Sequence, residues 1–470
     1  MVAELVFRSA VDQAAMIRAR EVSSVELLES HLTQIERINP VVNAIVSIEI
    51  ERARSRARVC DQQTSSGVEL GLLHGLPTAH KDLVEVAGLT STHGSPIFVD
   101  HVPATDDLIA ERIKAAGAIA IGKTNVPEFG AGSQTFNRVF GVTYNPWDLS
   151  KTPGGSSGGA AVALATGMIP IADGSDFGGS LRNPASFCNV VGFRPSPGLV
   201  PSWPKLAAWS VLSVEGPMGR SVQDVALQLA ATAGQDLRSP VALSDSPEVF
   251  FGSLDRDLRG LRVAWTDDLD LPTDPAVVAA LGPARRLLEE AGARVEEAAP
   301  DLGDAGQIFQ VLRAAQMEIS LGELYDQRGD EFKDTLQWNI AEARDRPLTD
   351  LTDALRAHGR LYHRVREFFQ RFDVLALPVT QVPPFDVDLE WVREIDGVQM
   401  STYIDWMRSC SDISLTTCPA ISVPAGFTDE GLPVGIQLVG PHRSDMKLLR
   451  IARAFEKAID VGARRPPLIG

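Results

Sequence analysis

The stretch GGSSGGAAVALATGMIPIADGSDFGGSLR, residues 154–182, decides the fold class of this sequence. It holds two segments rich in glycine and serine, 154–159 and 174–182, separated by the apolar run 160–172. An alanine-rich run followed by a short apolar run is typical of a helix and then a strand. The two polar segments are therefore predicted to be loops joined by a short helix and strand.

The second loop carries a candidate nucleophile. Glycine permits positive φ angles and a close approach of the backbone to a ligand. Successive N–H groups could therefore converge as an oxyanion hole. These donors would come from Phe177, Gly178, Gly179 and Ser180. The hydroxyl group of Ser180 would then lie beside the N–H groups that bind the oxygen of the substrate carbonyl group.

A serine nucleophile needs a base, and neither loop contains a histidine. Lys81 is the candidate, because it follows the apolar approach GLP at 75–77 and is expected to be buried. Burial disfavours the ammonium form, which lowers the pKa of a lysine toward neutrality. Taken alone, however, a lysine in this position is more often a surface ion-pair partner.

Two other motifs point to different chemistry. Residues 117–124, GAIAIGKT, match the phosphate-loop pattern, but a predicted helix runs into Gly117 and Pro127 follows, which is the wrong context for that loop. Residues 154–158 match the GxSxG elbow of α/β-hydrolases, with histidines downstream. An elbow needs a buried strand before it, whereas 145–153 is polar and contains two prolines. Both interpretations are therefore disfavoured.

The rest of the chain fits an α/β fold of one domain, 1–470. Residues 1–65 are predicted to be helices, with Ser23 or Ser24 as a cap and an end near Asn39-Pro40. Residues 66–240 alternate between apolar runs and helices and form the catalytic α/β core. Residues 241–400 are predicted to be mostly helical and to shape the substrate site. Residues 401–470 return to strands and a helix that complete the core.

Composition excludes several classes of function. The net charge is −17 and no basic stripe is present, which argues against nucleic-acid binding. No uncharged stretch is suited to span a bilayer, and no signal peptide is recognised, so we expect a soluble cytoplasmic protein. The four cysteines lack CxxC spacing, so we expect neither a disulfide framework nor a zinc site. They are Cys60, Cys188, Cys410 and Cys418.

Four segments together resemble the amidase signature family over nearly the whole chain. They are the loop 154–159, the loop 174–182 with Pro184-Ala185, Lys81-Asp82, and GLPVGIQ at 431–437. The resemblance implies a mixed central sheet of many strands covered by helices on both faces. It also implies that Ser180 is the nucleophile, that Ser156 follows a cis peptide bond after Gly155, and that Lys81 is the base. No cofactor or metal is implied.

Other residues near the loops are given supporting roles. We interpret Asp176 and Arg182 as an ion pair that fixes the nucleophile loop. Ser157 is expected either to hydrogen-bond Lys81 or to have a purely structural role in its loop. Phe177 replaces the smaller residue of many relatives and is expected to narrow the pocket. His80 alternates away from Lys81 in a strand and is expected to be a surface or packing residue.

These inferences predict hydrolysis of an amide-type bond through an acyl-enzyme on Ser180, with Ser156 and Lys81 as proton relay. The substrate is expected to be a small amide, anilide or carbamate (urethane), and the protein a monomer or homodimer. The alternative is the A subunit of a tRNA-dependent amidotransferase, which frees ammonia from glutamine for a partner. Aromatic residues could line the pocket, although each is more often a core residue. They are Trp203, Trp209, Phe309, Trp338, Trp391, Tyr403 and Trp406.

Overall fold

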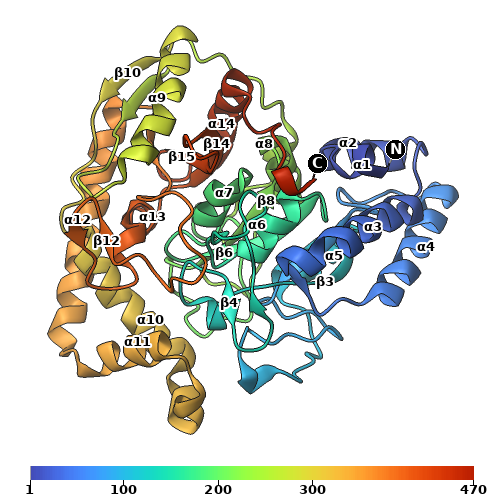
Figure 1. Ribbon diagram of the computed structural model, residues 1–470, viewed down its shortest axis with the longest axis horizontal. Helices are drawn as coiled ribbons and strands as arrows, with labels where there is room; N and C mark the ends of the chain where they lie inside the picture. The colour runs from blue at the N-terminus through green and yellow to red at the C-terminus, as the bar shows by residue number, and fades with distance from the viewer. Residues whose placement is uncertain (1, 470) are drawn as a thin grey trace.

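An eleven-stranded mixed sheet runs through the computed structural model, which describes residues 2–469 (Figure 1). Met1 and Gly470, the ends of the predicted domain, lie outside the described residues. The strand order is β1-β3-β2-β6-β8-β7-β14-β15-β11-β9-β10. The strands are β1 Ile45–Val46, β2 Pro77–Lys81, β3 Ile119–Thr124, β6 Ile171–Asp176, β7 Val191–Arg194, β8 Val214–Gly219, β9 Arg262–Trp265, β10 Arg294–Glu297, β11 Val374–Pro378, β14 Ala420–Phe427 and β15 Pro433–Val439.

Two small hairpins and the helices complete the described chain. The hairpin strands are β4 Phe136–Asn137, β5 Gly141–Val142, β12 Glu394–Ile395 and β13 Val398–Gln399. The α-helices are α1 Val2–Val6, α2 Ala10–Arg18, α3 Ser24–Val42, α4 Ile50–Ser66, α5 Leu108–Ala115, α6 Gly158–Ala165, α7 Arg182–Cys188, α8 Val222–Thr232, α9 Pro275–Glu290, α10 Ala305–Arg328, α11 Asp334–Asp345, α12 Leu348–Arg371, α13 Arg408–Leu415 and α14 Asp445–Ile459. Short 3₁₀ helices are η1 Pro96–Phe98, η2 Glu128–Gly130, η3 Pro247–Phe251, η4 Gly329–Glu331, η5 Asp405–Met407 and η6 Pro467–Ile469.

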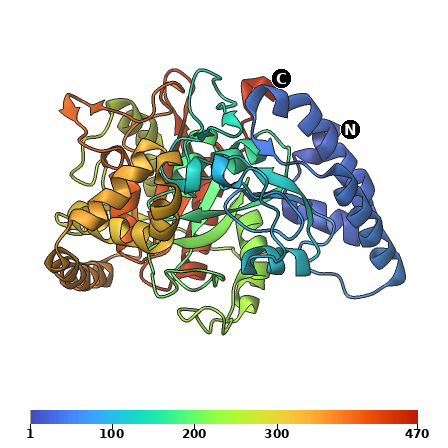
Figure 2. The ribbon, with the colours of Figure 1, turned by 90° about the horizontal axis from the view of Figure 1, so that it is seen from below.

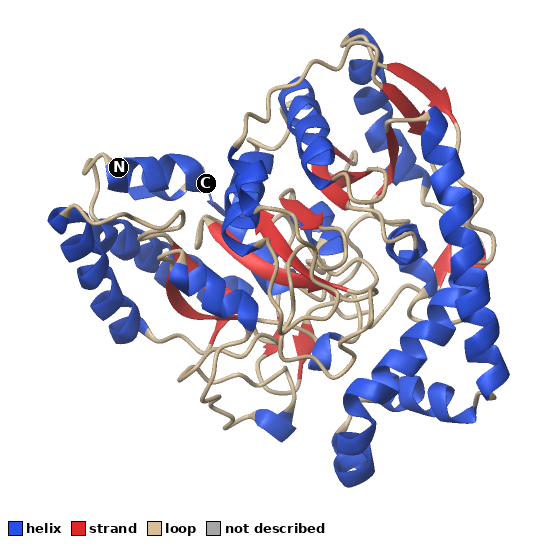
Figure 3. Ribbon diagram, turned by 180° about the vertical axis from the view of Figure 1, so that it is seen from behind, coloured by secondary structure: helices blue, strands red, loops and turns tan. Residues whose placement is uncertain are grey.

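Helices cover both faces of the sheet, as predicted, and the strands lie within a shell of helices (Figure 2 and Figure 3). Side chains of a strand point alternately to its two faces. In β11, Val374 and Ala376 join the core that includes α8, α9 and α14. Leu375 and Leu377 join the core that includes α10, α12 and α13. Each face of the sheet is therefore buried under its own layer of helices.

Helix α3 begins where its sequence predicts. Ser23 Oγ accepts the N–H of Glu26, and the Glu26 carboxylate accepts the N–H of Ser23 at 2.9 Å, a reciprocal cap. The predicted end near Asn39-Pro40 is wrong. The helix continues to Val42, and Asn43 ends it in a left-handed conformation with φ 50°.

The region 241–400 contributes more strand than its pattern predicts. Its long helices α9 to α12 are present, but β9, β10 and β11 also belong to the main sheet. β9 pairs in parallel with both β10 and β11. These strands are four or five residues long and lie between long helices, so the helical periodicity of their surroundings hides them.

Two neighbouring parallel strands, β2 and β6, position the candidate site. Lys81 is the last residue of β2 and Asp176 is the last residue of β6. Because the carboxyl ends of parallel strands meet at the same edge of a sheet, the lysine lies beside the loop that follows Asp176. Helix α6 packs against both strands, which brings the loop before it to the same edge.

Candidate active site

The side chain of Lys81 is completely buried at the end of β2. Its Nζ lies 2.8 Å from Ser156 Oγ, 3.0 Å from Ser175 Oγ and 3.3 Å from the Ser175 carbonyl oxygen. Burial lowers the pKa of Lys81 to about 7, while the negative charges of Asp176 and Asp173 act in the opposite direction. A lysine with such a pKa can accept and return a proton near neutral pH.

Ser156 follows a cis peptide bond to Gly155, the geometry that the family resemblance implied. The Gly155 carbonyl oxygen accepts a hydrogen bond of 2.8 Å from Ser133 Oγ. Gly130 faces the serine: a Cβ added there would lie 3.5 Å from Ser156 Oγ and 2.7 Å from Leu83, at a positive φ of 69°. Ser133 thus holds the backbone of the loop, while the hydroxyl group of Ser156 contacts Lys81.

The sequence offered Ser157 as a hydrogen-bond partner of Lys81, but the structure places the hydroxyl group of Ser175 there instead. Ser157 Oγ is buried and has no hydrogen-bond partner among the described residues. It packs toward Gly174, where an added Cβ would lie 2.7 Å from that oxygen. The expected hydrogen bond from Ser157 to Lys81 is therefore wrong, and the structural role considered for Ser157 remains.

Ser180 lies at the amino-terminal side of α7, and its side chain is partly exposed. Its carbonyl oxygen accepts the N–H of Ser157 at 3.2 Å, which joins the two glycine-rich loops. Within residues 2–469 there is no hydrogen bond between Ser180 Oγ and Ser156 Oγ. Hydrogen bonds of this kind are often long in unliganded enzymes.

One of the four predicted oxyanion donors is already occupied. The Gly179 N–H donates to Asp176 Oδ1 at 2.8 Å, because that buried carboxylate lies inside the turn and attracts it. Gly179 is therefore removed from the predicted set of oxyanion donors. The N–H groups of Phe177, Gly178 and Ser180 donate to no loop or side-chain acceptor among the described residues. They remain the candidate donors.

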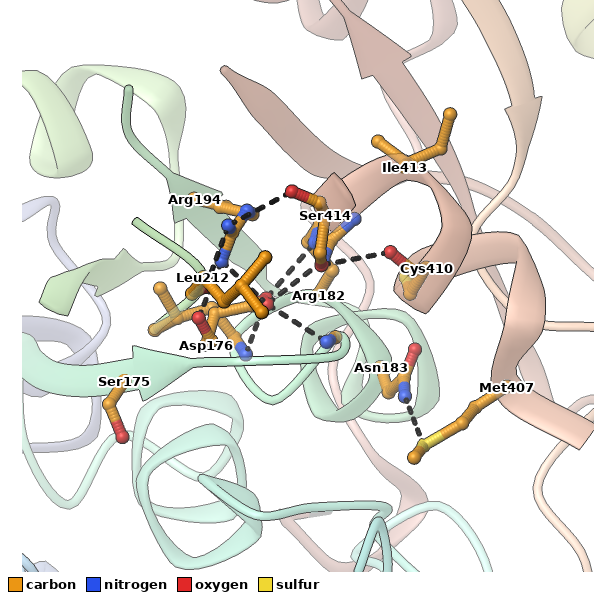
Figure 4. Close-up of polar contacts among 12 residues, drawn as sticks. Ser175, Asp176, Arg182, Asn183, Arg194, Leu212, Met407, Cys410, Ile413 and Ser414 are labelled. Carbon is orange, nitrogen blue, oxygen red and sulfur yellow. Dashed lines mark hydrogen bonds and ion pairs between the residues drawn. The ribbon is translucent and has the colours of Figure 1, made fainter. Parts of the chain in front are cut away.

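Asp176 lies between two buried arginines (Figure 4). Arg182 donates to both of its carboxylate oxygens, at 2.9 and 3.0 Å, and Arg194 Nη1 lies 3.3 Å from Oδ1. The predicted pair of Asp176 and Arg182 is thus present. Arg182 also donates to Ser414 Oγ at 2.7 Å and to the side-chain oxygen of Gln437. The nucleophile loop is therefore tied to α13 and β15.

Asp176 stays ionised in this network. Burial alone raises its pKa, but the guanidinium groups of Arg182 and Arg194 hold the pKa of Asp176 well below its usual range. Its carboxylate also accepts the N–H of Leu181 at 3.1 Å. A permanently charged acceptor thus organises the backbone on both sides of Ser180.

A second buried network supports Lys81 from the strand below, and sequence reasoning missed its acidic member. Asp173 Oδ1 accepts the N–H of Lys81 at 2.7 Å, and Oδ2 contacts His80 Nδ1. His80 is therefore a packing residue, one of the two roles expected for it. Lys123 of the phosphate-loop-like motif is buried in β3 and donates to the carbonyl oxygen of Val84, so it has a structural role. Asp173 and Arg194 are charged residues within or beside apolar runs, and this pattern could have indicated buried charged groups near the site.

A small cavity lies next to the Ser156 loop. Ser133, whose hydroxyl group holds the Gly155 carbonyl, lines it from one side. Lys333 and several aromatic residues line it from the other, including Trp391, Tyr403 and Trp406. Of the other aromatic candidates, Trp209 is 79% exposed and is no part of this wall. Neither Ser156 nor Ser180 lines this cavity, which has room for about one water molecule, so it marks the side chains around the Ser156 loop.

The sequence of residues 26–449 matches the Amidase protein family. This chain belongs to the amidase family. An acylamidase of Rhodococcus erythropolis is 34% identical over 463 residues, covering 97% of each chain. The A subunit of the glutamyl-tRNA(Gln) amidotransferase of Symbiobacterium thermophilum is 35% identical, covering 96% of each.

Solved structures agree with this amidase fold. A bacterial aryl acylamidase of the amidase signature enzymes superposes with a TM-score of 0.88 at 28% identity, over 98% of this chain and 99% of the other. A 6-aminohexanoate cyclic dimer hydrolase gives 0.88 at 27% identity, over 99% of both. The relatives support amide hydrolysis as the general activity of this amidase.

Three other kinds of feature are missing from the described chain. Residues 2–469 hold no cluster of three or more His, Cys, Asp or Glu side chains arranged for a metal ion. Among these residues, no helix combines the length and apolar character needed to cross a bilayer. In the same part of the chain all four cysteines are buried thiols, outside any disulfide bond.

Proposed function

We propose that this amidase hydrolyses a small-molecule amide, anilide or carbamate through an acyl-enzyme on Ser180. One observation carries the proposal: the Nζ of Lys81, with a pKa lowered to about 7 by burial, lies 2.8 Å from Ser156 Oγ. A buried amine in contact with a serine hydroxyl group can serve as a general base.

Lys81 and Ser156 act as a relay. Neutral Lys81 takes the proton of Ser156, and Ser156 takes the proton of Ser180 as Ser180 Oγ adds to the carbonyl carbon. The same route in reverse delivers a proton to the departing nitrogen. Water then attacks the acyl-enzyme by the same path and releases the acid. No proton is created or lost over the full cycle.

The oxyanion of the tetrahedral intermediate is stabilised by backbone donors. The N–H groups of Phe177, Gly178 and Ser180 have no competing loop acceptor, and the Asp176 network holds their loop in place. A preorganised donor of this kind is worth on the order of 3 kcal/mol in the transition state.

The aromatic surroundings of the site and the relatives support this substrate class. Trp391, Tyr403 and Trp406 lie around the small cavity beside the Ser156 loop, and such rings suit an aryl or alkyl group. The names of an acylamidase and an aryl acylamidase among the relatives support an anilide. Carbamates contain the same kind of scissile carbon–nitrogen bond, so we include them among the proposed substrates. We also propose that the protein acts in the cytoplasm.

A labelling experiment tests the proposal. The purified protein is treated with a serine-directed phosphonyl fluoride, mapped by peptide mass spectrometry, and assayed on chromogenic anilides, esters, primary amides and aryl carbamates. We expect label on Ser180 and turnover of an anilide. Ser180→Ala should retain the fold and lose both, whereas Ser157→Ala is the matched control. Label on Ser156 or Ser157 would contradict the assignment.

The second candidate is the A subunit of an amidotransferase, favoured by the relatives of that name at 32–35% identity. In that role the triad releases ammonia from glutamine for a partner protein. Release of ammonia from glutamine, together with co-purification of a partner, would support it. Turnover of an anilide by the isolated chain excludes an obligatory partner.

A further inference from the structure

Arg313 is a buried cation without a counter-ion. Three arginines of the described residues are buried: Arg182, Arg194 and Arg313, the last with 4% of its surface exposed. The first two are paired with Asp176. Within residues 2–469 Arg313 takes part in no ion pair. Burying an unpaired charge is unfavourable, so such a residue requires an explanation.

The neighbours of Arg313 are neutral. Its guanidinium group donates to the side-chain oxygen of Asn339, whose Nδ2 donates to Tyr403 Oη at 2.7 Å. It lies 5.2 Å from the centroid of the Tyr403 ring. Burial raises the pKa of Tyr403, so the phenol does not supply a negative charge. An arginine has five N–H donors, and this environment leaves room for another acceptor.

Helix α10 carries Arg313 to the oxyanion loop. Phe309 and Arg313 are four residues apart and share one face of the helix. Phe309 packs against the loop: its ring lies 5.6 Å from that of Phe177, and its Cζ would be 2.9 Å from a Cβ on Gly178. Arg313 lies 5.9 Å from the centroid of the Phe177 ring. The guanidinium group of Arg313 thus lies beside the side chain of Phe177, whose N–H is one of the proposed oxyanion donors.

Through Tyr403, Arg313 is connected to the small cavity beside the Ser156 loop. Tyr403, which contacts Arg313, and Lys333 both line the cavity beside the Ser156 loop. Burial lowers the pKa of Lys333 to about 8, and the nearby charges of Glu390 and Glu128 act in the opposite direction. Glu390 also lines the cavity and offsets Lys333. Neither Lys333 nor Arg313 forms an ion pair within residues 2–469, and of the two Arg313 is the more deeply buried.

We propose that Arg313 binds a carboxylate carried by the substrate, so that the preferred substrate is an anionic amide with a short spacer between its carboxylate and its scissile carbonyl. This specificity rests on the proposed function. The guanidinium fork matches a carboxylate in shape and charge, and the substrate would supply the missing counter-ion. Phe177 would separate this site from the oxyanion hole.

Matched substrates test the proposal. One series is the 4-nitroanilides of succinic, glutaric and adipic acid with their monomethyl esters, which place the carboxylate on the acyl side. The other is N-acetyl-4-aminobenzoate with its methyl ester, which places the carboxylate on the leaving amine. We expect kcat/KM for the acid to exceed that for its methyl ester by about tenfold or more in one series. Equal values in both series would overturn the proposal.

Variants assign the preference to a residue. Arg313→Gln should remove most of the preference for the acid and change kcat/KM for the neutral esters by less than about threefold. Arg313→Lys should retain part of it, because the charge remains without the fork. Lys333→Met tests the other cation of this region, and Arg356→Gln, at an arginine whose side chain is 68% exposed, is the matched control. A preference that survives in Arg313→Gln and disappears in Lys333→Met would contradict the assignment.

A binding measurement separates this proposal from the proposed function. Titration calorimetry of the Ser180→Ala protein with the glutaric 4-nitroanilide and its methyl ester needs no catalysis. Stronger binding of the acid, weakened by salt, supports the carboxylate site even if no substrate is turned over. Equal binding of the two overturns it. If Arg313→Gln does not fold, Arg313→Lys and Lys333→Met are compared in the same way, and a preference reduced only in Lys333→Met overturns the proposal.

Discussion

Ser175 Oγ lies 3.0 Å from Lys81 Nζ, at the penultimate position of β6. Lys81 is therefore held by a hydroxyl group from strand β6 and one from the loop before α6, since Ser156 contacts the same nitrogen. The hydroxyl group of Ser175 carries no charge, so it orients the Lys81 amine without holding it in the ammonium form as a carboxylate would. This arrangement makes Ser175 a positioning residue for the proposed base.

Ser175→Ala should lower kcat by about tenfold to a hundredfold, because Lys81 loses an acceptor that orients its Nζ. A hydroxyl acceptor also favours the ammonium form, so the pKa of Lys81 should fall and the acidic limb of the rate profile should move to lower pH. Ser157→Ala, which removes a buried hydroxyl group without a partner, is the matched control and should change kcat little. Equal losses in both variants would argue against a specific role for Ser175.

The rate should depend on pH through Lys81. The reactive form is the amine and burial lowers the pKa of Lys81 to about 7, so kcat/KM should rise through pH 7 and then level off. Asp173 raises this pKa, so Asp173→Asn should move the limb to lower pH. Rates measured from pH 5 to 10 with a neutral anilide check both statements. A rate that does not change between pH 6 and 9 would contradict the role of Lys81.

Amides and esters should respond differently to loss of the lysine. An amine leaves only with a proton, whereas an alkoxide has less need of one. Lys81→Met should therefore reduce hydrolysis of an anilide more than hydrolysis of the matched aryl ester. Parallel measurement of kcat/KM on both substrates tests this. Equal losses would mean that Lys81 serves only to activate the nucleophile.

The same substitution should make the folded protein more stable. The folded-state pKa of Lys81 is about 7 against 10.5 for an unperturbed lysine, so the unfolded state binds more protons between these values. Stability contributed by this site is therefore lowest below pH 7 and rises with pH toward 10. At pH 7 the penalty is at most roughly 4 kcal/mol, part of which Lys81→Met should recover.

Urea denaturation at pH 7 and pH 9.5 measures this effect. The advantage of Lys81→Met over the unaltered protein should shrink at the higher pH. The exposed Lys114, whose side chain is 57% accessible, provides the control Lys114→Met. A destabilised Lys81→Met protein at pH 7 would show that the contacts of Lys81 outweigh its desolvation.

Asp176→Asn should destabilise the fold by about 3–5 kcal/mol, because Arg182 and Arg194 would remain buried without a carboxylate. The pKa of Asp176 is lowered in the folded state, so its contribution is present above about pH 4 and is lost as pH falls further. Thermal unfolding measures the loss. Asp353→Asn, at a 72% exposed side chain paired with Arg356, should change the melting temperature little.

The sequence predicts well those features that depend on local pattern. Helix α14 spans Asp445–Ile459, and the sequence pattern of the tail predicts a helix over this same range. The helix and strand predicted between the two glycine-rich segments are α6 and β6, although the loops are shorter than predicted because α6 begins at Gly158 and β6 continues to Asp176. The Lys81–Ser156 contact agrees with the family resemblance. These features are encoded within short segments or in a motif of several residues.

Features that depend on long-range pairing are not predicted in this way. β9 was hidden because its partner β11 lies more than a hundred residues away and its own run is only four residues long. Ser175 and Ser157 are both serines beside glycines, and only the pairing of β6 with its neighbours decides which hydroxyl group faces Lys81. Arg313 is invisible in sequence, because a charged residue in a helix is ordinarily solvated.

The bonds from Arg182 to Ser414 and Gln437 also bear on how the protein is made. A ribosome synthesises Ser180 long before it reaches the strand that carries Gln437. Until that strand emerges and enters the sheet, the arginine that holds the nucleophile loop lacks two of its partners. A nascent or truncated chain therefore carries Ser180 in a loop that lacks part of its support. The geometry around Ser180 thereby depends on residues that lie 232 and 255 positions after Arg182 in the chain.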